Sequence, residues 1–230
     1  MSDHPHGSGL SQFQLDLARV FFALPESVGF LLAGGGALIA HGLVARDTDD
    51  LDFFTARRGE IESPVAAAGE ALIATAAEHG WVVETVRSGP EFRRLKITRG
   101  ADALPTDVGS GETVYVDLAV DGPPSEGATC TVAGPALAPQ ELAVRKTLAL
   151  FGRAEPRDFT DVYVLHQQFD RAEILRAATE ADPGFDLRVF VQMLRSHRRL
   201  RDEDFPETGV PVEYLRAYYD NWTTTLEQAE

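Results

Sequence analysis

The chain has 230 residues, 44% of them hydrophobic and 25% charged, and its formal net charge is -15. A chain of this length buries one good core, or one core with a smaller helical appendage. Charged residues, glycine and histidine interrupt every apolar stretch well short of the roughly 18 residues that cross a membrane, so we expect no transmembrane helix. The negative charge repels phosphate backbones, so a nucleic-acid substrate would need a local basic patch.

Two features predict a cytoplasmic protein. The segment 1–11 is polar and lacks the basic and apolar regions of a signal peptide. The single cysteine, Cys130, cannot form an internal disulfide and has no second thiol with which to build a metal site. A reducing compartment fits both observations, and we expect the protein in the cytoplasm.

The first predicted elements are a helix, a strand and a second helix. Apolar residues at helical spacing predict an amphipathic helix over 11–24, with Ser11 as its N-cap. The apolar run 28–33 predicts a strand, which ends in three consecutive glycines before helix-forming residues at 37–41. The expected order is therefore strand, glycine turn, helix.

More strands follow in the first part of the chain. Strands are predicted over 50–54, 81–86, 92–98 and 113–120, and an alanine-rich helix over 63–80. A turn-rich stretch separates the last two strands and holds Gly100, Pro105, Gly109 and Gly111.

From Pro139 onward the pattern becomes helical. Helices are predicted over 140–151, 159–169, 171–180, 186–199 and 212–228. We therefore predict an α/β (α+β) fold, with a mixed β-sheet flanked by helices in residues 1–138 and a helical C-terminal region in residues 139–230.

Asp50 and Asp52 form a pair of acids on one predicted strand. Side chains at i and i+2 leave the same face of a strand, so both carboxylates point together while Leu51 points to the opposite side. A cation between them keeps both ionised, and hard oxygen ligands favour Mg²⁺ or Mn²⁺ completed by substrate phosphates. The pair predicts a metal site for phosphoryl or nucleotidyl transfer. The alternative is a chance Asp-x-Asp on an exposed strand of a chain with 36 acidic residues.

Asp117 is the third candidate acid. It lies in the predicted strand 113–120, where valine and leucine alternate on one face and Asp117 shares the other face with Tyr115. In metal-assisted transfer such a residue serves as a metal ligand or as a general base toward the attacking hydroxyl. The alternative is a solvated acid on the polar side of a half-buried strand.

Gly34, Gly35 and Gly36 allow a ligand to approach the backbone closely. Amides at the start of the following helix offer hydrogen-bond donors and a positive dipole end to a triphosphate. The run is neither a dinucleotide fingerprint nor a P-loop. A tight strand-to-helix turn without a ligand is the alternative.

Together these segments resemble the nucleotidyltransferase (polymerase beta-like) superfamily. Within it, the chain resembles the AbiEii/AbiGii toxin family. The segments that carry this resemblance are Leu32-Ala-Gly-Gly-Gly-Ala-Leu38, Arg46-x-Thr-x-Asp-Leu-Asp-Phe-Phe54, Lys146-Thr-Leu-Ala-Leu150 and Arg157-Asp-Phe-Thr-Asp-Val-Tyr163. The likeness spans residues 30–165.

The resemblance implies a metal-dependent enzyme that moves a nucleotidyl group from a nucleoside triphosphate (NTP) onto an acceptor. In toxin members the implied acceptor is RNA, notably tRNA, and the implied partner is a cognate antitoxin. The matching positions are Asp50, Asp52 and Asp117 for Mg²⁺ or Mn²⁺, Gly34, Gly35, Gly36 and Lys146 for the nucleotide, and Asp158 or Asp161 for the late acid.

Other interpretations of these positions stay open. Lys146 is equally typical of a surface lysine whose stem snorkels along a helix, and Asp158 of a cap for a helix that begins at Phe159. Relatives usually carry Ser or Thr where this chain has Gly36, so a hydroxyl expected to contact phosphate is missing. His41 is more typical of a structural residue than of a ligand.

Three functions compete at this stage. The first is the RNA-modifying toxin of a toxin–antitoxin pair. The second is a transferase acting on a small cationic acceptor such as an aminoglycoside, which the negative charge suits. The third is a noncatalytic nucleotide-binding module of the same fold.

Two clusters of basic residues are candidate RNA contacts, although solvated faces are more typical of such runs. They are Arg93, Arg94, Lys96 and Arg99, and Arg195, Arg198, Arg199 and Arg201.

Overall fold

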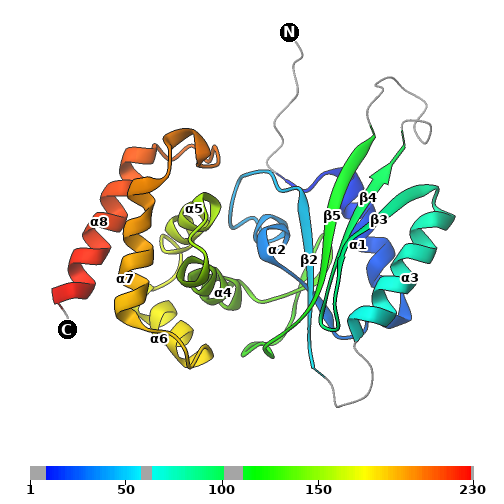
Figure 1. Cartoon of the computed structure of the whole chain (residues 1–230), viewed down its shortest axis with the longest axis horizontal. Helices are drawn as coiled ribbons and strands as arrows, with labels where there is room; N and C mark the ends of the chain where they lie inside the picture. The colour runs from blue at the N-terminus through cyan, green and yellow to red at the C-terminus, as the bar shows by residue number, and fades with distance from the viewer. Residues whose placement is uncertain (1–8, 58–63, 101–110, 229–230) are drawn as a thin grey trace, which may run out of the picture. The chain divides into compact units, whose positions relative to one another are not determined.

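The computed structural model describes residues 9–57, 64–100 and 111–228 and divides the chain into two compact units. Unit 1 comprises Met1–Gly42 and Asp47–Ala138, and unit 2 comprises Leu43–Arg46 and Pro139–Glu230 (Figure 1). The short segment 43–46, which the sequence assigns to the first region, thus groups with the helical unit. Within the described ranges, no helix is both long enough and apolar enough to span a membrane.

Unit 1 is built on a mixed sheet whose seven described strands have the order β3-β4-β5-β2-β1-β7-β6. The strands are β1 (Phe30–Ala33), β2 (Asp50–Ala56), β3 (Trp81–Ser88), β4 (Phe92–Arg99), β5 (Glu112–Asp121), β6 (Thr129–Thr131) and β7 (Gly134–Ala136). The β2–β5 and β1–β7 pairs are parallel and the other pairs are antiparallel. The mixed sheet with flanking helices predicted from the sequence is confirmed.

Helices α1 (Gln12–Phe22) and α3 (Pro64–Glu78) pack on the same side of this sheet (Figure 1). Ser11 caps α1, as predicted, and it also forms a capping box with Gln14. The ring of Phe21 stacks on that of Phe53 from β2, with centroids 4.2 Å apart. Because side chains alternate along a strand, burial of Phe53 on this side directs Asp50 and Asp52 to the other side.

The glycine run differs from its prediction. Helix α2 spans Gly34–Ala40, so Gly34, Gly35 and Gly36 form its first turn rather than a separate turn before it. Gly34 has φ +58, a left-handed conformation that glycine adopts without a steric penalty.

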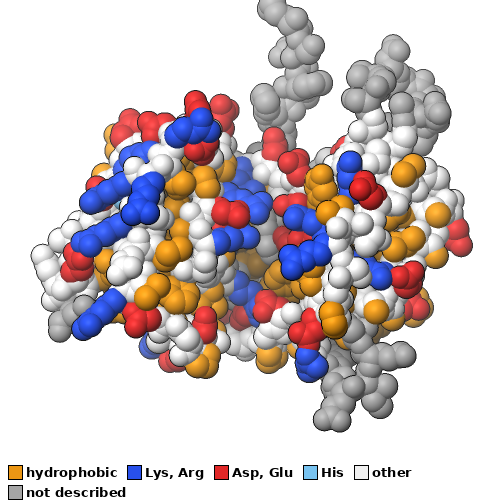
Figure 2. Space-filling model, viewed as in Figure 1, with side chains coloured by type: hydrophobic (Ala, Val, Ile, Leu, Met, Phe, Trp, Pro, Cys, Tyr) orange, Lys and Arg blue, Asp and Glu red, His pale blue; other side chains and the backbone are white. Residues whose placement is uncertain are grey.

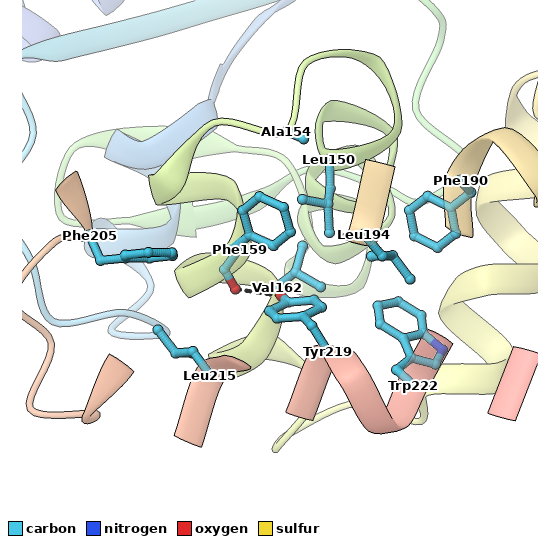
Figure 3. Packing of buried hydrophobic residues seen from close by; sticks show 10 residues of the cluster. All are labelled: Leu150, Ala154, Phe159, Val162, Phe190, Leu194, Phe205, Leu215, Tyr219 and Trp222. Atoms are coloured by element: carbon cyan, nitrogen blue, oxygen red, sulfur yellow. Dashed lines mark hydrogen bonds between the residues drawn. The ribbon is translucent and has the colours of Figure 1, made fainter. Parts of the chain in front are cut away.

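Unit 2 is helical. Its helices are α4 (Pro139–Gly152), α5 (Pro156–Leu165), α6 (Arg171–Ala181), α7 (Leu187–Arg195) and α8 (Val212–Gln228), with short 3₁₀ turns at Ser196–Arg199 and Asp202–Asp204. Buried side chains of α4, α5, α7 and α8 share one apolar core, in which Trp222 and Tyr219 are the largest (Figure 3). The Tyr219 hydroxyl donates a hydrogen bond of 2.5 Å to the carbonyl oxygen of Phe159, so this buried phenol is satisfied.

Helices α5 and α7 differ from their predicted ranges, and α5 ends at Leu165 instead of 169. Helix α5 begins at Pro156 instead of 159, because proline is favourable in the first turn of a helix. Helix α7 ends at Arg195, and the predicted continuation to 199 is a 3₁₀ turn. The predicted positions Ser63, Pro105 and Gly109 lie outside the described residues.

His166, just after α5, is held between aromatic rings of α8. Its Nδ1 lies 2.7 Å from the Tyr218 hydroxyl, and its ring centroid is 4.9 Å from that of Trp222. Burial and, to a lesser extent, the charge of Arg171 lower the pKa of His166 from 6.5 to about 4, against the opposing charge of Asp170. The imidazole is therefore neutral in the folded protein at neutral pH.

This neutral histidine makes stability depend on pH in a defined window. Between pH 6.5 and about 4 the unfolded chain binds a proton at this site that the folded chain does not, so stability falls as the pH drops through this range. Glutamine does not titrate, so we expect the loss of unfolding free energy across this pH range to be smaller in His166→Gln by up to about 3 kcal/mol. Urea denaturation at several pH values measures it, with exposed His79→Gln as the control. An unchanged pH slope in His166→Gln would contradict the assignment.

Candidate active site

The three predicted acids lie on adjacent strands of unit 1. Strand β2 pairs with β5 in parallel, and this register places Asp52 opposite Asp117 and Asp50 opposite Tyr115. Leu51 and Phe53 are fully buried, whereas the side chains of Asp50 and Asp117 are 18% and 15% exposed. The structure thus brings the acids to one face of the sheet while the alternate residues of β2 enter the core.

Arg94 of β4 ties two of these acids together. Its Nη2 donates to Asp50 Oδ1 at 2.9 Å, and its Nε lies 3.1 Å from Asp117 Oδ1. The guanidinium also lies over the ring of Tyr115, 5.3 Å from the centroid. A cation therefore sits among the acids, in contact with two of them and with an aromatic face.

Gly34 makes room for the third acid. A Cβ atom built at this position would lie 1.9 Å from Asp52 Oδ2, far inside any allowed contact. The carboxylate of Asp52 therefore lies directly against the first residue of α2, and only glycine permits this approach.

Gly36 occupies a different environment. A Cβ atom there would lie 3.1 Å from Leu51 Cδ2 and 3.6 Å from the Asp50 carbonyl oxygen. A Ser or Thr side chain at this position would thus begin against the core side of β2. The glycine at position 36 therefore affects the packing of α2 against Leu51, in addition to removing a hydroxyl group.

The donor set fits a divalent metal ion in its chemistry, since it consists of carboxylates converging from neighbouring strands. At Gly34 the absence of a side chain leaves space for the Asp52 carboxylate, which also favours a metal site at these acids. Among the residues that the structure describes, however, no three His, Cys, Asp or Glu side chains are arranged as a metal-binding group. The predicted three-acid metal site is therefore not preformed, and Arg94 occupies two of its acids.

Lys146 and Asp158 lie in unit 2, inside a buried network of charges. Lys146 Nζ is 2.8 Å from Asp161 Oδ2 and 3.4 Å from Asp158 Oδ1. Arg46 donates two hydrogen bonds of 2.8 Å to Asp161, and Arg153 donates bonds of 2.8 and 3.0 Å to Asp158. Both acids are fully buried, so Lys146 is a buried ion-pair partner and not a snorkelling surface residue.

The two buried acids remain ionised. Burial raises the pKa of Asp158, but the hydrogen bond from Arg153 and the charge of Lys146 outweigh it and leave the pKa below 3.8. Burial likewise raises the pKa of Asp161, and the hydrogen bond from Arg46 with the charge of Lys146 brings it below 3.8. Asp158 also accepts from the Glu155 amide, so it caps α5 from within the first turn.

The first basic cluster, one of two candidate RNA contacts, is largely neutralised by acids. Arg93 pairs with Glu70, Lys96 with Glu84, and Arg99 with Asp16 and Glu112, while Arg94 belongs to the acid site. The second cluster lies in unit 2, where Figure 2 shows Lys and Arg side chains gathered over α7 and α8. Arg195, Arg198 and Arg201 there also contact acids.

Two features of the structure escape the sequence analysis. Arg94 is predicted as a solvated residue, yet its position on the polar side of β4, next to the strand of Asp117, is the signal that could have linked it to the acids.

An open pocket of about 590 Å³ in unit 2 carries none of the predicted site residues. Its lining is Tyr163, His166, Gln167, Phe169, Asp170, Arg171, Tyr214 and Tyr218.

Two solved structures from Helicobacter pylori are similar to this chain at 14% sequence identity. JHP933 has a TM-score of 0.47, and a chain provisionally described as a nucleotidyltransferase has a TM-score of 0.50. Each likeness covers 96% of this chain and 99% of the other. At this identity, the second likeness supports the fold alone. No curated protein matches the chain.

The mixed sheet with its Asp-x-Asp strand beside a third acid defines a nucleotidyltransferase-like fold. The chain matches the family of nucleotidyl transferase AbiEii toxins of type IV toxin–antitoxin systems over residues 16–227. It therefore belongs to this family and is a nucleotidyltransferase. The match includes the helical unit, beyond the segment 30–165 on which the sequence resemblance rests.

The space at Gly34 can be tested by adding one methyl group. We expect Gly34→Ala to displace the Asp52 carboxylate and to destabilise the protein by more than the roughly 1–2 kcal/mol of a left-handed alanine. Gly42→Ala is the matched control, because Gly42 has φ +70 but nothing within 4 Å of its Cβ position. Chemical denaturation compares the two variants, and equal losses would show that Asp52 does not press on Gly34.

The buried charges of unit 2 give a second test. We expect Lys146→Met to cost about 3 kcal/mol of folding free energy, because it removes the cation that both buried acids share. Arg176→Met removes an exposed pair with Glu180 and should cost less than about 0.5 kcal/mol. If Lys146→Met leaves stability unchanged, the network does not stabilise the fold.

Proposed function

We propose that this protein is a cytoplasmic, Mg²⁺- or Mn²⁺-dependent enzyme that transfers a nucleotidyl group from an NTP to an RNA acceptor, in particular tRNA. The observation that carries the proposal is the convergence of Asp50, Asp52 and Asp117 on one face of the sheet, with Gly34 making room for a carboxylate. Membership of the AbiEii toxin family supports the same reaction class.

Asp50, Asp52 and Asp117 are the residues that would hold the metal ion. A divalent ion bound there supplies charge neutralisation and polarisation of the phosphates. The protein's part is to present oxygen ligands from two adjacent strands on a rigid sheet, which fixes where the triphosphate reacts.

The transfer forms one bond and breaks another at the α-phosphorus. The acceptor hydroxyl oxygen bonds to the α-phosphorus, the bond from this phosphorus to the bridging oxygen breaks, and pyrophosphate leaves. We propose that a carboxylate oxygen of Asp117, on β5, takes up the proton that the acceptor hydroxyl loses. The other two acids, on β2, then serve only as ligands.

The triphosphate is assigned to the backbone amides of Gly34, Gly35 and Gly36 and to Lys146. The backbone N–H groups of a helical first turn have no partners within the helix and can donate hydrogen bonds to phosphate oxygens. The family resemblance assigns Lys146 to the triphosphate and Asp158 to the catalytic residues. Lys146 already forms ion pairs with Asp158 and Asp161, so these acids would compete with the phosphates for its charge.

We assign RNA contacts to unit 2. This unit holds 13 of the 21 Lys and Arg residues but fewer than half of the 36 acids. Because several of these arginines contact acids, we expect modest RNA affinity that weakens as salt is added. The family also implies a cognate antitoxin as the protein partner.

The acid pair is tested by conservative substitution. We expect Asp50→Asn with Asp52→Asn to abolish transfer of label from α-³²P-labelled NTPs to total tRNA, a loss of at least about a thousandfold, because neutral amides cannot replace carboxylate ligands. Asp49→Asn, on an exposed neighbour, should retain activity.

An aminoglycoside panel forms a parallel arm of this assay. Label found only on the small molecules would replace the RNA acceptor with a cationic one. Activity that survives in the double variant would remove the proposed metal site.

A further inference from the structure

Arg94 is the residue that stands between the acids of unit 1 and any metal ion. Its guanidinium contacts Asp50 at 2.9 Å and Asp117 at 3.1 Å, and these are two of the three carboxylates assigned to the ion. Asp50 Oδ1 accepts a hydrogen bond from the guanidinium, and Asp117 Oδ1 forms an ion-pair contact with it, so neither oxygen is fully open to a metal ion while Arg94 is in place. The two cations therefore compete for the same oxygens.

The sheet fixes Arg94 in this position. Antiparallel pairing of β4 with β5 places Arg94 directly opposite Asp117, and Tyr115, two residues earlier on β5, lies under the guanidinium. The Arg94 side chain is 35% exposed, whereas its two acid partners are 18% and 15% exposed. The arginine thus covers the acids from the solvent side and can leave without disrupting the core.

Three carboxylates on one face repel each other, and a cation among them lowers that repulsion. The guanidinium of an arginine is a permanently charged group, so Arg94 can keep this compensating role until another group displaces it. Release needs either a stronger cation or an anion that attracts the arginine. A metal–NTP complex supplies both, because phosphate oxygens accept guanidinium hydrogen bonds well.

We infer that Arg94 is a resident counter-cation that holds Asp50 and Asp117 until a metal–NTP complex displaces it, and that it then binds the triphosphate. The inference rests on the proposed metal-dependent function. It makes Arg94 a positioning residue for the metal site and a binding residue for the nucleotide. One consequence is that metal alone binds weakly and metal with NTP binds cooperatively.

Mn²⁺ titration followed by electron paramagnetic resonance tests this inference without an activity assay. In the absence of nucleotide, we expect Arg94→Gln to bind Mn²⁺ at least about tenfold more tightly than the unmodified protein. Arg94→Lys should be intermediate, since lysine keeps the charge but lacks the planar, delocalised fork of the guanidinium and stacks less well on Tyr115. With NTP present, the cooperativity between metal and nucleotide should shrink in Arg94→Gln.

Lys96→Gln is the matched control. Lys96 lies two residues along β4, on the same face, and pairs with exposed Glu84 at 3.9 Å. Its loss removes the same charge from the same face without freeing the acids, so Mn²⁺ affinity should change little. Equal affinity gains in the two variants would reduce the role of Arg94 to bulk electrostatics and overturn the inference.

The outcomes also separate this inference from the proposed function. If the unmodified protein binds Mn²⁺ with NTP, and Asp50→Asn abolishes this binding, the metal site stands. Arg94→Gln with unchanged or weaker Mn²⁺ affinity then overturns the role of Arg94 alone. If no variant binds Mn²⁺ under any condition, both proposals fail. Should Arg94→Gln fold poorly without metal, Arg94→Lys supplies the comparison.

Discussion

The parallel pairing of β2 with β5 is the constraint on which the site depends. It sets Asp52 opposite Asp117, and the strict alternation of side chains keeps Asp50 on the same face. On the other face the same alternation buries Leu51 and Phe53, and Phe53 stacks on Phe21 of α1. A shift of one residue would exchange the two faces, placing acids in the core and apolar residues at the site. Core packing and site geometry are therefore fixed by one register.

Charge compensation is the second theme, and both units use arginine and lysine for it. In unit 1 a partly exposed Arg94 contacts Asp50 and Asp117. In unit 2, Asp158 and Asp161 are fully buried, and Lys146 with flanking arginines keeps their pKa values below 3.8. The exposed arrangement permits exchange of the cation, whereas the buried one costs several kcal/mol to break. This difference suits the first to ligand binding and the second to holding helices together.

Much of the fold is predictable from the sequence, because periodicity is a local signal. The alternation in β2 and β5, the capping box at Ser11 and the helical pattern after Pro139 all depend on neighbours along the chain. The start of α2 at Gly34 was not predictable, since a glycine run disfavours a helix unless tertiary contacts require it. In this chain the close approach of Asp52 supplies that requirement.

The individual acids of the site are predictable, but their surroundings are not. Alternation places Arg94 on the polar face of its strand, but only the register of β4 against β5 sets it opposite Asp117. Segment 43–46 groups with the helical unit, where Arg46 pairs with Asp161, 115 residues away in the chain. Such long-range pairs are invisible to periodicity, so neither Arg46 nor Arg94 could be matched to its acid partner from the sequence.

The opposition of Asp52 and Asp117 has an evolutionary consequence. Like charges directly opposite each other weaken a sheet, so neutral residues at these positions would strengthen it. Selection for thermal tolerance or high expression would then favour changes at two of the acids to which we assign the metal ion. A lineage freed from the need for toxicity would be expected to lose its acids early, while keeping, or even improving, the scaffold around them.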